Sequence, residues 1–205
     1  MTALCFDIGS NIGAWTLANI NTYEKIISVE ADPITYQRLI TNCTDSKIIC
    51  LNFAVCDNDG NDITFFQCEA NTLSTLNKDW LTDKKSRFYN TKYNEIICKT
   101  ITLDFLINKY GKPNLIKMDV EGGEYECIKS LTQKVDQLCF EWASELADIT
   151  FKCLDHLYNI GFTKFYIQNG DNYTFRPTEY TSIENVKLQL SRTIPKKDWG
   201  MIWCV

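Results

Sequence analysis

Residues 5–16, CFDIGSNIGAWT, pass from an apolar run through an acid and two glycines into a helix-like segment. Gly9 and Gly13 permit a tight turn and close approach of a ligand to the backbone. The stretch lacks the G-x-G-x-x-G spacing that places a pyrophosphate at a helix N-terminus. Asp7 would repel a pyrophosphate, whereas it suits a cationic or amine-bearing ligand. A strand, turn and helix without a ligand is the plainer interpretation of this stretch alone.

Strand-like and helix-like runs alternate along the rest of the chain. The main strands are predicted at residues 2–9, 25–32, 47–55, 113–120 and 137–142, with a closing antiparallel pair at 163–169 and 200–205. Helices are predicted at residues 12–21, 33–44, 103–110 and 147–160, and from about residue 124. A turn at Asn58-Asp59-Gly60 predicts a hairpin arm at residues 62–68, and residues 96–102 form another short strand. This pattern predicts an α/β fold with a doubly wound, mostly parallel sheet and an antiparallel closing strand.

Composition narrows the classes of partner and compartment. A chain of 205 residues suits one domain, and its net charge of −5 argues against a nucleic-acid partner. The short basic cluster Lys84, Lys85 and Arg87 is expected to be solvated surface. No apolar run reaches the roughly 18 residues of a membrane span, and Asp7 interrupts the only apolar N-terminal run. Ten cysteines without CxxC pairs and a single histidine do not suggest zinc, and we expect a reducing, cytoplasmic compartment.

Acids follow the ends of five predicted strands, where ligands bind in doubly wound sheets. These strand ends are residues 7–13, 30–32, 54–57, 119–124 and 141–142. Glu30 stands 17 residues after Gly13, and its carboxylate could accept hydrogen bonds from both hydroxyls of a ribose. The predicted ligand is therefore a nucleoside with a positive appendage that carries no phosphate, and S-adenosylmethionine fits this description.

Five segments, in chain order, resemble the FkbM-family methyltransferases, a branch of the class I S-adenosylmethionine-dependent enzymes. They are FDIGSNIGAWT, SVEADPITYQRLITNC, LNFAVCDNDG, TITLDFL and LIKMDVEGGEYECIKS, within roughly residues 4–142. The resemblance implies a Rossmann-like class I fold, S-adenosylmethionine as cofactor, and O-methylation of sugars or other polyhydroxylated molecules. It implies that Asp7, Gly9, Ser10, Asn11 and Gly13 bind the methionine side of the cofactor, Glu30 and Ala31 the ribose side, and Ala54, Val55 and Asp57 the adenine side.

Methylation of a hydroxyl group needs a general base or a metal ion that acidifies the hydroxyl. His156 lies inside a helix-like run, so carboxylates are the candidates. Asp119 is the first candidate, and Lys117 lies on the same face of its strand, where a buried lysine needs an acidic partner. Glu121 and Glu141 complete the candidate catalytic set. For Glu121 a helix-dipole role is equally favoured, and for Glu124 the helix-dipole role is preferred.

Asp119 and Glu141 end neighbouring strands, so the two carboxylates are expected to share a proton or to bind a divalent cation. Class I O-methyltransferases that use magnesium place acids at these two strand ends, so a Mg²⁺ or Mn²⁺ site at Asp119 and Glu141 stays open beside a shared proton. A third ligand is not apparent in the sequence.

Residues 71–94 are polar but contain Trp80, Phe88, Tyr89 and Tyr93. As a set these aromatic side chains are the predicted wall for a sugar acceptor, while each one alone is better explained as packing.

Other functions and a larger context stay open. An N-methyltransferase, an O-methyltransferase for molecules other than sugars and a non-catalytic S-adenosylmethionine-binding domain are the alternatives. The N/D-P-P-aromatic signature of many N-methyltransferases is absent, and the intact Gly9, Gly13, Glu30 and Asp119 argue against an inert domain. We expect one methyltransferase domain over residues 1–205, which is either cut from a longer chain or supplied with a lid by a partner. The resemblance also implies fusion to, or partnership with, glycosyltransferase domains.

Overall fold

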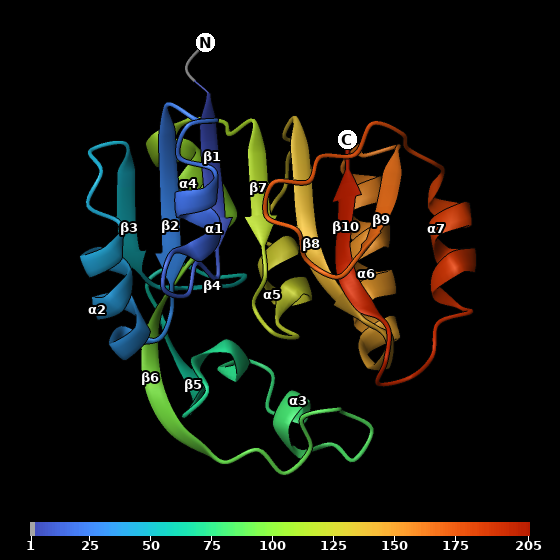
Figure 1. Ribbon diagram of the computed structural model, residues 1–205, viewed down its shortest axis with the longest axis horizontal. Coiled ribbons are helices and arrows are strands. Elements are labelled where there is room, and N and C mark those ends of the chain that lie inside the picture. The colour runs from blue at the N-terminus through green and yellow to red at the C-terminus, as the bar shows by residue number, and fades with distance from the viewer. Residues whose placement is uncertain (1–2) are drawn as a thin grey trace.

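A seven-stranded sheet forms the centre of the computed structural model, which describes residues 3–205 (Figure 1). Its order is β3-β2-β1-β7-β8-β10-β9. The strands are β1 (Leu4–Ile8), β2 (Lys25–Glu30), β3 (Ile48–Asn52), β7 (Leu115–Met118), β8 (Gln137–Ala143), β9 (Phe165–Asn169) and β10 (Trp199–Cys204). The first five of these pair in parallel, whereas β10 runs antiparallel to both β8 and β9. The predicted mostly parallel sheet with an antiparallel closing strand is confirmed.

Helices cover both faces of this sheet, with α1 in front and α4 and α6 behind in the view of Figure 1. The helices are α1 (Ala14–Ala18), α2 (Pro33–Asn42), α3 (Asp79–Thr82), α4 (Leu103–Tyr110), α5 (Glu124–Ile128), α6 (Ala147–Asn159) and α7 (Ile183–Leu190), with 3-10 turns η1 (Asn71–Leu73) and η2 (Ser144–Leu146). Side-chain caps explain several starts: Asp32 accepts from the Ile34 amide and Thr102 from the Phe105 amide. Within residues 3–205 no helix combines the length and apolar character needed to cross a membrane.

Successive residues of each strand face two different cores. Phe6 and Ile8 of β1 pack into the larger core with side chains from α4 to α7. Cys5 points to the opposite face and packs with Trp15 of α1 and Trp203 of β10. By the same period of two, Asp7 lies on the Cys5 face, where it is fully buried. A carboxylate is thus placed inside the α1 layer and needs a partner there.

A second, three-stranded sheet lies beneath the carboxyl ends of β1, β2 and β7 (Figure 1). It consists of β4 (Ala54–Val55), β6 (Tyr93–Ile101) and β5 (Asp62–Cys68), in that order. The predicted hairpin through Asn58-Asp59-Gly60 is wrong, because β5 pairs antiparallel with β6 rather than with the strand before the turn. The Gly60 amide donates instead to the Thr100 carbonyl of β6 at 2.9 Å. The small sheet closes the lower side of the region where the strand ends meet.

The Arg87 guanidinium ties the segment between β5 and β6 to the main sheet. Its Nε and Nη2 atoms donate to the two carboxylate oxygens of Glu145 at 2.6 and 2.7 Å, and Nη2 also donates to the Asp198 carbonyl. The Glu145 side chain is 2% exposed and that of Arg87 is 18% exposed. Arg87 is therefore not the solvated surface residue that its basic cluster predicts. A bidentate pair of this kind holds the segment in a defined position.

Gly9 sits where the ends of β1 and β7 meet. Its φ of 71° lies in the left-handed region, and a Cβ atom there would be 1.8 Å from the Asp119 carbonyl oxygen. The close approach that this glycine permits is therefore made by the chain's own backbone. The Asp119 amide donates to the Ile8 carbonyl at 3.0 Å and completes the contact.

We expect Gly9→Ala to lower the free energy of unfolding by about 3 kcal/mol or more, since left-handed strain and a backbone clash add together. Gly60→Ala is the matched control, because Gly60 also has a left-handed φ of 72° but has no atom within 4 Å of the added Cβ. It should cost only about 1–2 kcal/mol. Urea unfolding measures both variants, and equal losses would contradict the crowding at Gly9.

Candidate functional site

A cavity of about 290 Å³ opens at the carboxyl ends of β1, β2 and β7. This size is at the lower end of typical small-molecule pockets, which measure roughly 300–1,000 Å³. Ten of the residues predicted for the site line it: Gly9, Ser10, Asn11, Glu30, Ala31, Ala54, Val55, Lys117, Asp119 and Glu121. The carboxyl ends of the parallel strands therefore bring these residues together from distant parts of the chain, as predicted.

Glu30 provides a carboxylate at one wall of this cavity. Its Oε2 accepts from the Asn11 amide and its Oε1 from the Asp32 amide, both at 2.9 Å. Burial raises the pKa of Glu30 to about 7, although these two amide bonds oppose the effect. Each carboxylate oxygen keeps acceptor capacity, because one oxygen can accept two hydrogen bonds. The arrangement suits a pair of ribose hydroxyls.

Apolar side chains line another wall of the cavity beside Ala54 and Val55. This wall includes Phe53, which lies between β3 and β4. Phe65 of β5 and Leu76 of the segment after β5 also belong to it. This wall can hold a flat, aromatic base. The Asn71 amide also donates to the Asn11 side chain at the cavity's rim. Phe65, Asn71 and Leu76 were not predicted from the sequence, because β5 and the segment after it lie under the strand ends and not in the predicted hairpin.

Three predicted cofactor residues do not line the cavity. Asp7 is buried behind it, and Gly13 precedes α1 with a φ of 91°, where a Cβ would lie 2.3 Å from the Cys43 sulfur. Asp57 pairs with Lys129 at 2.8 Å, and its bond from this ammonium group lowers the pKa of Asp57. Roles for these three residues in cofactor binding stay predictions.

Lys117 is the buried cation of the site. Its ammonium nitrogen lies 3.3 Å from Asp7 Oδ1 and 3.5 Å from Asp119 Oδ2. These are the acidic partners that the sequence predicted for a buried lysine. Burial alone would lower the pKa of Lys117, but attraction to Asp7 and Asp119 raises it well above its usual range. Lys117 therefore stays charged and holds Asp119 at the cavity wall.

Asp119, Glu121 and Glu141 converge, with one carboxylate oxygen from each lying within 4.8 Å of the others. Glu121 supplies the third carboxylate that was not apparent from sequence, at a strained φ of 55° and with a bond from Trp80 Nε1 at 3.2 Å. Burial raises the pKa of Glu121 and of Glu141 well above the usual range, and the other acids raise both further. This cluster can share protons or hold a cation.

Two other titratable residues have structural roles, as predicted. The Glu124 carboxylate accepts from the Val120 and Gly122 amides at 3.2 and 3.3 Å, at the start of α5. His156 Nε2 lies 2.8 Å from the Leu131 carbonyl oxygen and so has a partner away from the cavity. Neither residue lines the cavity at the strand ends.

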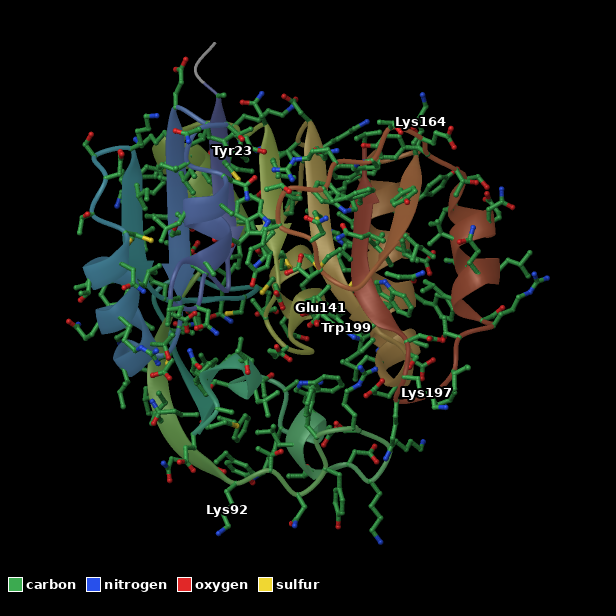
Figure 2. All side chains as sticks on the ribbon, in the orientation of Figure 1. Tyr23, Lys92, Glu141, Lys164, Lys197 and Trp199 are labelled. Carbon is green, nitrogen blue, oxygen red and sulfur yellow. The ribbon has the colours of Figure 1, made fainter. Side chains whose placement is uncertain are left out.

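A second, more open hollow of about 780 Å³ adjoins the cavity. Asp119, Glu121 and Tyr173 line both, and Glu141, Asp171 and Trp199 line the hollow alone. Glu141 and Trp199 lie near each other at the lower end of β8 and the start of β10 (Figure 2). Both Tyr173 and Trp199 come from the C-terminal part, where the sequence carried no motif.

The predicted aromatic wall from residues 71–94 is not found at this hollow. Trp80 is only 2% exposed and packs with Leu81 and Phe88 in a core of its own. Tyr93 packs edge-on against Phe66. Trp80, Phe88 and Tyr93 are therefore packing residues, the role predicted for each one alone. Tyr89 is 48% exposed and does not line the hollow.

The comparisons with known proteins agree with this geometry. The sequence model of the methyltransferase FkbM domain matches residues 7–180. A curated relative, hexuronic acid methyltransferase AglP of Haloferax volcanii, is 28% identical over 139 residues, which are 66% of this chain and 52% of the relative. The chain thus spans about half the length of that relative.

Solved structures show the same fold at low sequence identity. Precorrin-6y C5,15-methyltransferase from Geobacter metallireducens aligns with a TM-score of 0.50 and 8% identity, covering 100% of this chain and 80% of that protein. Precorrin 8w decarboxylase from Methanobacterium thermoautotrophicum aligns with a TM-score of 0.50 and 10% identity, covering 100% and 82%. The predicted class I Rossmann-like methyltransferase fold is confirmed.

We expect Glu141→Gln to stabilise the protein without ligand at pH 8 by about 1–2 kcal/mol in the presence of EDTA. Folding raises the pKa of Glu141 above the value of about 4.5 that it has in the unfolded chain. The wild type therefore loses free energy of unfolding as the pH rises above that value, whereas the variant has no carboxyl group to cause this loss. Unfolding in urea at pH 5 and pH 8 measures the gain, which should disappear at pH 5. The exposed Glu179→Gln is the control, and a gain that is the same at both pH values would refute the explanation.

Proposed function

We propose that the chain, which belongs to the FkbM methyltransferase domain family, transfers the methyl group of S-adenosylmethionine to a hydroxyl group of a sugar. Family and fold identify an S-adenosylmethionine-dependent methyltransferase. The observation that carries the hydroxyl acceptor is the convergence of three carboxylates where the cofactor cavity meets the open hollow. A base is needed there for a hydroxyl nucleophile.

The cavity's residues fit S-adenosylmethionine. Glu30 would hold the ribose hydroxyls with its free acceptor positions, and the Phe53 and Phe65 wall would contact the adenine. The loop at Gly9–Asn11 remains for the methionine part of the cofactor. When bound, the cofactor supplies a methyl group on a positively charged sulfur, which is a good leaving group.

Asp119 is the proposed general base. It lines both the cavity and the hollow, so its carboxylate can face a hydroxyl next to the methyl donor. The hydroxyl proton would pass to an Asp119 oxygen while Lys117 holds the other side of the carboxylate. Positioning of the two reactants at the shared boundary supplies much of the remaining acceleration.

A divalent cation is the second way in which these carboxylates could activate a hydroxyl. Asp119, Glu121 and Glu141 offer three oxygen ligands, which Mg²⁺ and Mn²⁺ prefer. The ion would lower the pKa of a bound hydroxyl group, and the three carboxylates would hold it.

The nature of the acceptor is supported by likeness as well as by geometry. The curated relative is a hexuronic acid methyltransferase, so its acceptor is a sugar derivative. Methyl transfer to an amine needs less help from a base, so N-methylation would leave the three converging carboxylates without a purpose. A sugar hydroxyl therefore accounts for more of the site than an amine does.

We expect Glu30→Ala to raise the dissociation constant of S-adenosylmethionine at least tenfold. It removes two hydrogen bonds to a charged group, worth about 1.5–3 kcal/mol each before compensation. Isothermal titration calorimetry measures the change. Glu24→Ala is the matched control, because Glu24 is an exposed residue just before the amino end of β2. Unchanged affinity in the Glu30 variant would refute the ribose role.

We expect Asp119→Asn to lower kcat by about 10²–10⁴ while cofactor affinity stays within a few-fold of the wild type. Labelled methyl transfer to a panel of sugars gives kcat, with the exposed Asp148→Asn on α6 as control. Turnover close to that of the wild type would exclude Asp119 as the base. Activity that EDTA does not change leaves Asp119 as a direct base, whereas loss in EDTA and recovery with Mg²⁺ indicates the cation.

A further inference from the structure

Acidic side chains dominate the charged residues that line the hollow beside the proposed cofactor cavity. Four carboxylates line it: Asp119, Glu121, Glu141 and Asp171. Within residues 3–205, its lining includes no lysine, arginine or histidine. Any acceptor that enters the hollow therefore meets acids without an exposed counter-charge.

The cations near the hollow are already committed to partners, as Arg87 is to Glu145. Lys117 is 3% exposed and its ammonium group pairs with Asp7 and Asp119. Arg176 lies on the same loop as Asp171, but its Nη2 donates to Asn19 Oδ1 at 2.7 Å and its guanidinium stacks on Trp203. None of these three groups lines the hollow, so none is placed to bind an anionic acceptor there.

Two aromatic side chains give the hollow apolar surface of the kind that a sugar ring can lie against. Tyr173 is 40% exposed and Trp199 is 41% exposed, so part of each side chain is open to solvent. Their rings are rigid and amphipathic. The acids around them offer oxygen atoms that accept hydrogen bonds, and sugar hydroxyls can donate these bonds.

We propose that the acceptor of this chain is an uncharged sugar, and that the hollow rejects hexuronic acids, in contrast to the named substrate class of the curated relative. This inference rests on the proposed function. A hexuronate carboxylate is ionised at neutral pH. In the hollow it would lie among acids, with no cation in the lining to pair with it. An anion that loses water without gaining a counter-charge is costly, and this cost disfavours the charged acceptor.

Asp171 is the specificity-determining residue in this proposal. It lies just after β9 in a loop that reaches the hollow, and the structure gives its carboxylate no hydrogen bond or ion pair among the described residues. It is separate in sequence from the three carboxylates proposed for activation of the hydroxyl. Burial raises the pKa of Asp171 to about 6, so assays at pH 8 keep it charged.

The test compares neutral methyl pyranosides with the hexuronic acids of the same gluco, galacto and manno configurations. Labelled methyl transfer is measured at pH 8, once with EDTA and once with Mg²⁺. We expect kcat/KM for the neutral member to exceed that of its hexuronic acid by at least about tenfold in both conditions. Asp171→Asn should narrow this ratio several-fold, while Glu179→Gln, an exposed change on the same loop, should leave it unchanged.

The outcomes separate this inference from the proposed function. Equal or faster methylation of the hexuronic acids, with or without Mg²⁺, would overturn the inference while sugar methylation stands. Binding of S-adenosylmethionine by calorimetry without methylation of any sugar would overturn both. An unchanged ratio in a folded Asp171→Asn variant, checked by its thermal unfolding, would remove Asp171 from the explanation even if neutral sugars are preferred.

Discussion

The buried ammonium group of Lys117 is the interaction on which the rest of the site depends. It joins Asp7 at the end of β1 to Asp119 at the end of β7, and Asp7 also accepts a bond from Thr16 of α1 at 2.6 Å. Thr16 in turn lies 2.8 Å from the Ser28 hydroxyl of β2. One hydrogen-bond and ion-pair network therefore links β1 to its two neighbours, β2 and β7, and to helix α1. Since breaking a buried pair leaves an uncompensated charge, the alignment of these strand ends is strongly constrained.

The same edge of the sheet holds acids that are not compensated in this way. Glu141 and Asp171 have raised pKa values because burial and neighbouring acids disfavour their charged forms. A fold selected for stability alone would not gather such groups, since each one costs free energy at neutral pH. Lys117 is paired with Asp7 and Asp119, whereas the lining of the hollow provides no cation for Glu141 and Asp171. This contrast marks the boundary between the scaffold and the proposed acceptor site.

Local sequence signals predicted most of the strand-end residues that line the cavity proposed for the cofactor. Glu30 and the Gly9 turn end strands whose apolar runs are unmistakable, and parallel strands bring their carboxyl ends to one edge. The hairpin prediction failed because β5 finds its partner in β6, beyond a segment of irregular structure that local turn chemistry cannot anticipate. Tyr173 and Trp199 could not be predicted, because their positions depend on a long connection between β9 and β10. No period or motif marks such residues.

The connection between β9 and β10 contributes a wall that the cavity and the hollow share. Tyr173 lines both the cavity and the hollow. The loop that carries it is fixed at Arg176, whose guanidinium stacks on Trp15 of α1 and Trp203 of β10 and bonds to Asn19. Because α1 follows directly from the Gly9–Gly13 turn, the loop beside the hollow is braced against the turn beside the cavity. The proposed in-line transfer requires the two reacting atoms to be held in one frame, and this bracing would supply that frame from side chains far apart in sequence.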